Sequence, residues 1–210
     1  MNDNAEVGEL GLRATVGRAK WNERTKTQGL EVAELASPSR QDIRDEMDQA
    51  RETFQRLLSH ASPADLRRST QGTRWNNEQL LFHLLFGYLI VRALRWLVRG
   101  FGRLPDRLSA GFARALNSVS APFHAINYWG SRGGVIVFGH ARMGRKMDRV
   151  IASMQRHLEH ETDDALALRM HFPTRWDPFF TDVMTLADVY HYATQHFNYH
   201  RQQLTLRETQ

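Results

Sequence analysis

Residues 75–84 read WNNEQLLFHL, and the apolar run that they begin continues to Val91. Asn76 or Asn77 can cap a helix here, because an asparagine side chain accepts a hydrogen bond from the free N–H groups of a first helical turn. The run contains a histidine and is well short of the ~20 residues that a membrane-spanning helix needs. We therefore predict a buried helix that extends toward Arg99.

Three further segments have apolar residues spaced three and four apart, as an amphipathic helix requires. They cover residues 39–59, 142–161 and 185–204. The stretch from residue 100 to 144 is punctuated by glycine and proline and predicts short helices and loops. Within it, VIVF at residues 135–138 could form a strand, but a lone strand cannot satisfy its backbone hydrogen bonds, so a helix or an extended loop is preferred. The sequence thus predicts an all-α fold.

The chain has 210 residues, no cysteine and a formal net charge of +5. This length fits one domain, which we place at residues 39–206. Residues 1–38 have no sustained apolar period, so we expect an N-terminal arm that is partly disordered or wraps around the domain. Without cysteine, the protein has no disulfide and no thiol of its own. The polar start MNDNAE does not resemble a secretory signal, so we expect a cytoplasmic protein without a transmembrane segment. No nucleic-acid-reading motif accompanies the positive charge, so nucleic acid is not an expected partner.

HFNYH at residues 196–200 places two histidines four residues apart, on one face of the last predicted helix. The same helix has a polar stripe that includes Tyr192, Tyr199 and both histidines, which is typical of a pocket wall rather than of a solvent-facing surface. His83 lies within an apolar run, where its ring nitrogens need partners. Two interpretations stay open: one three-histidine site, or a core histidine with two surface histidines.

Four side chains are candidate substrate contacts: Gln79, Tyr192, Tyr199 and Arg92. Helical spacing brings the first three toward the histidines, although such residues more often serve packing. Arg92 shares a helix face with Arg95 and Arg99 and belongs to a strongly basic stretch between residues 80 and 150. Arginine binds carboxylates and phosphates in a bidentate manner, so one interpretation is an anionic substrate, and the other is a solvated basic face.

Two motifs together resemble the DinB-like metalloproteins. Residues 75–84 resemble that family's pattern of a tryptophan, an acidic helix start and an in-facing histidine followed by leucine, and residues 196–204, HFNYHRQQL, resemble its closing helix. The resemblance spans about residues 40–206. It implies an antiparallel four-helix bundle of DinB type with a long crossover, here with an N-terminal extension. PTRWDP at residues 173–178 also resembles a sub-group of the family, without an assignable role.

The resemblance further implies that His83, His196 and His200 hold one divalent metal ion. Three neutral imidazoles leave such an ion an open coordination position, which is the layout of a catalytic site. Zinc is the first choice, and nickel, iron or copper also suit imidazole ligands. A homodimer is also expected.

Several DinB-like proteins activate low-molecular-weight thiols, so the resemblance favours a mycothiol- or bacillithiol-type S-transferase acting on a small electrophilic substrate. One alternative is a metal-dependent hydrolase or isomerase of small-molecule metabolism. Another is a non-enzymatic binding protein with a structural metal. The sequence leaves the choice among these open.

Overall fold

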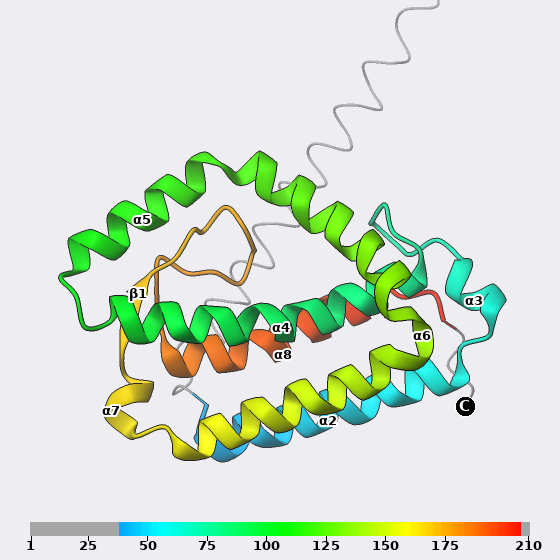
Figure 1. Ribbon diagram of the computed structural model, residues 1–210, viewed down its shortest axis with the longest axis horizontal. Coiled ribbons are helices and arrows are strands. Elements are labelled where there is room, and N and C mark those ends of the chain that lie inside the picture. Colours follow the sequence, from blue (N-terminus) through cyan, green and yellow to red (C-terminus); the bar gives the residue numbers. More distant parts are fainter. Residues whose placement is uncertain (1–37, 207–210) are drawn as a thin grey trace, which may run out of the picture. The chain divides into compact units, whose positions relative to one another are not determined.

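The computed structural model describes residues 38–206, so the predicted N-terminal arm lies, apart from Pro38, outside the described residues. The mostly helical architecture confirms the predicted all-α class, with one short hairpin added (Figure 1). In chain order the elements are α2 Arg40–His60, α3 Pro63–Arg67, α4 Asn77–Phe101, α5 Asp106–Ser118, α6 Ser120–His160, α7 Asp163–Leu166, β1 Arg169–His171, β2 Val183–Thr185 and α8 Leu186–Arg201.

Four long helices form the core of the described part. α4 packs against α6 and α8, and α2 packs against the same two helices. Figure 1 shows α4 beside α8, and α2 beside the C-terminal half of α6. Their buried side chains form one hydrophobic cluster, in which Phe54, Tyr88, Tyr190 and Phe197 are fully buried. Burial of such large side chains is the main force that holds these helices together.

α4 is the buried helix that residues 75–84 predicted. By length and composition it could cross a membrane, but 56% of its most apolar window is buried within the protein. Residues 80–85, which together point in all directions around the helix, are all buried. A segment that is buried on all sides is typical of the centre of a core.

Reciprocal hydrogen bonds fix where the two histidine-bearing helices begin. Asn76 accepts a hydrogen bond from the Gln79 N–H at 2.9 Å, and the Gln79 side chain accepts one from the Asn76 N–H at 3.2 Å. Thr185 and Asp188 make the same pair of bonds at the start of α8. Each pair of bonds forms a capping box, which satisfies N–H groups that the first turn of a helix leaves free.

The stretch between residues 100 and 144 is more helical than the sequence predicted. It forms α5 and the first part of α6, and residues 135–138 are helical, as preferred. α6 changes direction at Gly139, whose φ of 61° lies in the left-handed region that favours glycine. At Gly134 a Cβ would lie 2.1 Å from the Phe82 ring. The glycines that suggested loops therefore permit one kink and one close helix contact.

The sequence did not predict the hairpin of β1 and β2, in which Met170 pairs with Met184. Strands of three residues are too short to show an alternating pattern. The loop between them contains residues 173–178 and lies against the α5–α6 region. The Trp176 indole N–H donates to the Leu116 carbonyl at 2.9 Å, and its ring stacks on Phe123 with centroids 3.9 Å apart. These contacts position the loop beside α8.

Candidate metal centre

His83 from α4 lies with His196 and His200 from α8. One ligand nitrogen from each residue lies within 4.8 Å of the others. The i,i+4 spacing puts the two α8 histidines on one face, and the packing of α4 along α8 brings His83 to that face. His196 is only 4% exposed, which excludes the interpretation that makes it a surface residue.

Burial keeps all three imidazoles uncharged. It lowers the pKa of His83 to about 3, and the nearby His200 adds to this shift. Burial likewise lowers the pKa of His196 well below its ordinary value, helped by the other two histidines. The pKa of His200 is lowered by burial, against a smaller opposing effect of its hydrogen bond to Gln203. At neutral pH each ring therefore offers a lone pair, which is the form that binds metals.

Two of the imidazoles are oriented by a second side chain. Gln203 Oε1 lies 2.7 Å from His200 Nδ1, and because an amide oxygen only accepts, Nδ1 carries the proton and Nε2 carries the lone pair. Ser131 Oγ lies 3.3 Å from His83 Nδ1. Outer hydrogen bonds of this kind are typical of metal-binding histidines, since they fix the tautomer and the ring plane.

His196 has a different environment. Its Nδ1 atom is buried and has no hydrogen-bond partner among the described residues. The ring lies against α4 at Gly87, where a Cβ would be 2.6 Å from Nδ1. Three neutral imidazoles, two of them oriented and one with an unpaired nitrogen, are a donor set that fits a divalent ion.

Asp177, from the loop between β1 and β2, is a site residue that the sequence did not identify. Its Oδ2 lies 3.8 Å from His196 Nε2 and accepts a 2.9 Å hydrogen bond from the Tyr192 hydroxyl. Burial raises the pKa of Asp177. Burial, followed by the nearby Asp177 carboxylate, raises the pKa of Tyr192 far above its ordinary range. The only signal in the sequence was the acidic residue within PTRWDP.

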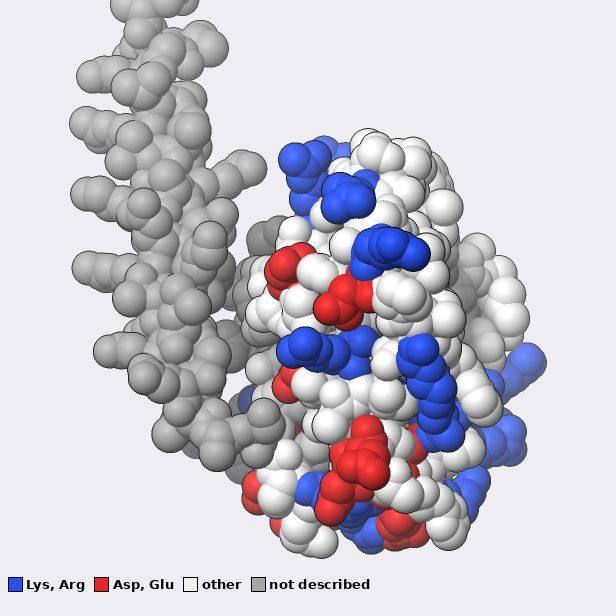
Figure 2. Space-filling view, turned by 90° about the vertical axis from the view of Figure 1, so that its left-hand side faces the viewer, with Lys and Arg blue, Asp and Glu red and all other residues white. Residues whose placement is uncertain are grey.

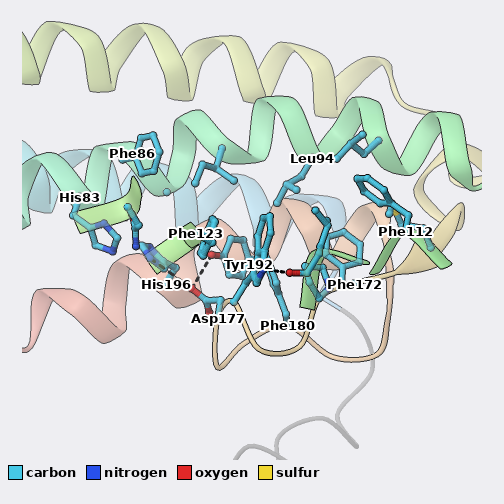
Figure 3. A pocket seen from close by; sticks show the side chains of 18 residues that line it. His83, Phe86, Leu94, Phe112, Phe123, Phe172, Asp177, Phe180, Tyr192 and His196 are labelled. Atoms are coloured by element: carbon cyan, nitrogen blue, oxygen red, sulfur yellow. Dashed lines mark hydrogen bonds and ion pairs between the residues drawn. The ribbon is translucent and has the colours of Figure 1, made fainter. Parts of the chain in front are cut away.

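A cavity of about 280 Å³ is lined at one end by His83 and His196. Figure 3 shows His83, His196 and Asp177 near one end and Phe112 and Phe172 near the other. Its walls come from α4, α5, α6, α8 and the β1–β2 region, so it exists only where these separate segments meet. Most of the lining side chains are apolar, as in many small-molecule sites.

Of the four candidate substrate contacts, Tyr192 lines this cavity and the other three are not among its lining residues. Gln79 belongs to the cap of α4. Arg92 is exposed on α4. Tyr199 packs edge-on against His200, with ring centroids 5.0 Å apart. The structure therefore brings one of the four candidates to the cavity.

Residues 46–204 match the family model of the DinB superfamily. Comparison with curated proteins and with solved structures gave no match. The matched range includes the three histidines, Asp177 and all residues that line the cavity. Because the match covers well over half of the chain, this protein belongs to the DinB superfamily.

Proposed function

We propose that His83, His196 and His200 bind one divalent metal ion and that the protein is a metal-dependent enzyme acting on a small molecule. The observation that carries this proposal is the convergence of three uncharged imidazoles, two of which line one end of a cavity. Zinc is our first choice, and nickel or iron is also compatible with imidazole ligands.

Three protein ligands leave a divalent ion an open position, where it would act as a Lewis acid toward a thiol, a carbonyl group or water. Side chains of the protein orient the metal ligands and the bound molecule. Gln203 and Ser131 orient the imidazoles of His200 and His83. Asp177, held by the Tyr192 hydroxyl, faces the cavity and can accept a proton from a bound molecule. The apolar walls limit the access of competing water.

Our leading reaction is transfer of a low-molecular-weight thiol, of the mycothiol or bacillithiol type, to a small electrophile. The chain contains no cysteine, so the thiol must come from outside. A bond forms between its sulfur and the electrophilic carbon, the leaving group departs with its electron pair, and the thiol proton passes to Asp177. Turnover of an electrophile that depends on added thiol is expected, and its absence would count against this reaction.

The second candidate is a metal-dependent hydrolase or isomerase. It is favoured by the position of Asp177, since a carboxylate 3.8 Å from His196 could take a proton from water or from a carbon beside a carbonyl group. A thiol-independent activity that is lost in His200→Ala would support it.

A third candidate is a binding protein with a structural metal. An ion with four protein ligands, the fourth being Asp177, would support this candidate.

We further propose an antiparallel four-helix bundle of DinB type with a long crossover at residues 39–206, preceded by a separate arm at residues 1–38. The single hydrophobic cluster of the four long helices supports one domain.

We also propose a cytoplasmic homodimer that does not bind nucleic acid. Light scattering of the full chain at several concentrations would test the oligomeric state.

The decisive experiment on the metal is elemental analysis of the full chain, prepared without a histidine tag. We expect about one metal ion per wild-type chain, and loss of the metal in His83→Ala, His196→Ala and His200→Ala with the helical circular dichroism retained. His157→Ala is the matched control, because this histidine is exposed on α6, away from the cluster. A metal-free wild-type protein, after growth with added zinc, nickel and iron, would refute the proposal.

A further inference from the structure

The cavity follows one face of α4. The residues of this helix that line it are His83, Phe86, Gly87, Ile90, Leu94 and Leu97. Their spacing of three and four residues keeps them on one stripe, and from His83 to Leu97 the stripe is about 20 Å long at about 1.5 Å per residue. The cavity is therefore elongated along the helix and is not a round space around the histidines (Figure 3).

Polar groups gather at the histidine end. Asp177 and the Tyr192 hydroxyl contact each other beside His196. Asn127 belongs to the same end, because its carbonyl oxygen accepts a hydrogen bond from Ser131, which in turn contacts His83. The Asn127 side-chain oxygen is buried and has no hydrogen-bond partner among the described residues. An unpaired buried acceptor is costly, so a donor on a bound molecule would be favoured there.

The opposite end is apolar. Figure 3 shows Leu94, Phe112 and Phe172 there, and Leu97 lies one turn beyond Leu94 on α4. A polar group placed among these side chains would lose its hydrogen bonds to water without gaining new ones. An apolar group would gain free energy in proportion to the surface that it buries. The two ends of the cavity thus require different chemistry from one occupant.

The basic residues of α4 do not serve the cavity. Arg95 Nη1 lies 3.6 Å from the buried carboxylate of Glu161, and Arg99 also pairs with Glu161. No lysine or arginine is among the lining residues in the described part of the chain. On the face shown in Figure 2 basic and acidic side chains are both present, and Arg40 pairs with Asp163. An anionic group inside the cavity would therefore lack a cationic side-chain partner.

We propose that the substrate is an amphiphile with a linear apolar tail, whose polar head lies at Asp177, Asn127 and the histidines and whose tail lies along α4 toward Phe112. The placement of the head rests on the metal site proposed above, whereas the placement of the tail does not. The cavity of about 280 Å³ has room for about nine water-sized groups at ~30 Å³ each. Head and tail together would therefore fill the cavity with about nine non-hydrogen atoms.

The first test measures calorimetric binding of straight-chain alkyl hydroxamic acids of increasing length to the zinc-loaded full chain. Each added methylene should raise the affinity about fourfold, because it leaves water for an apolar wall. The gain should stop when head and tail together reach about nine non-hydrogen atoms, because the cavity is then full. Affinity that does not change with chain length would overturn the proposal.

A parallel series of unbranched alcohols, measured on the metal-free chain, separates this inference from the metal site. If the alcohols gain affinity with length but the hydroxamic acids bind no better than the alcohols, the metal proposal fails and the tail pocket stands. If the hydroxamic acids bind zinc-loaded protein tightly without any effect of length, the metal site stands and the tail pocket is refuted.

Substitutions at the apolar end of the cavity test whether the tail of the ligand lies there. Leu94→Trp should fill the apolar end, so that short hydroxamic acids bind as before, longer ones gain nothing, and zinc content is unchanged. Ala93→Trp is the matched control, because Ala93 is exposed on the same helix and does not line the cavity. Phe112→Trp enlarges a side chain at the same end from α5 and replaces Leu94→Trp if that variant does not fold. Unchanged binding of long chains in a folded variant would overturn the proposal.

Discussion

The imidazole of His196 packs against α4 at Gly87, where a Cβ would lie 2.6 Å from Nδ1. Backbone atoms of α4 cannot easily move here, because residues 80–85, Gly87 and Tyr88 are buried. Gly87→Ala should therefore displace His196 and lower the affinity for zinc by at least about tenfold, the range seen when groups that orient metal ligands are lost. Competition with a chelating dye would measure this change.

Gly100→Ala is the control for this prediction, because a Cβ there meets no atom within 4 Å on the same helix. Alanine should leave zinc affinity unchanged and stabilise the helix by up to about 1 kcal/mol. Equal zinc affinities of Gly87→Ala and Gly100→Ala would show that the position of His196 does not control the site.

Gln203 has a comparable role for His200. Gln203→Leu removes the oxygen that accepts from Nδ1, so the imidazole loses its fixed tautomer and orientation. We expect zinc affinity to fall about 10- to 100-fold, with little change in the unfolding temperature of the metal-free chain. Gln202→Leu, at the exposed neighbouring position, should bind zinc as the wild type does. Equally weakened binding in both variants would argue against a specific role of Gln203.

Among the helices, the contact between α4 and α6 depends on Gly134. A Cβ at this position would lie 2.1 Å from the Phe82 ring, whereas at the neighbouring Gly133 it would meet nothing within 4 Å. Gly134→Ala should therefore cost about 1–3 kcal/mol of the free energy of unfolding through overpacking. Gly133→Ala should be neutral or stabilising by up to about 1 kcal/mol. Urea denaturation of both variants measures the difference, and similar stabilities would contradict the tight packing.

At the scale of the whole molecule, buried uncharged histidines make the metal-free fold sensitive to acid. The ordinary pKa of His83 is 6.5 and its folded pKa is about 3. Between these values the unfolded chain binds a proton that the folded chain does not, so stability is highest above pH 6.5 and falls as the pH is lowered. The loss approaches about 1.4 kcal/mol per pH unit for each such group.

Urea denaturation in the presence of a chelator, from neutral to mildly acidic pH, would measure this slope. His83→Gln should have a smaller slope than the wild type, because one buried imidazole no longer titrates. His60→Gln is the control, since this histidine is exposed at the end of α2 and its loss should leave the slope unchanged. Identical slopes in all three proteins would contradict the burial of an uncharged His83.

The sequence by itself determined the helices that carry the histidines. Helical period, capping residues and the i,i+4 spacing are local properties, so they predicted α2, α4 and α8 and the shared face of His196 and His200. The glycines between residues 100 and 144 favoured short helices and loops, whereas the structure has α5 and the first part of α6 there. Their use depends on which helix passes close by, as at Gly134 and Phe82, and no local pattern carries that information.

Only the tertiary structure decided what surrounds the histidines. Asp177 comes from a loop without any periodicity, and it reaches His196 because Trp176 is anchored on α5 and α6. Of the three arginines that share a face of α4, Arg95 and Arg99 pair with Glu161, far along the chain, whereas Arg92 is exposed. The cavity likewise needs walls from five separate elements. Each feature depends on contacts between distant segments, which residue spacing along one helix cannot specify.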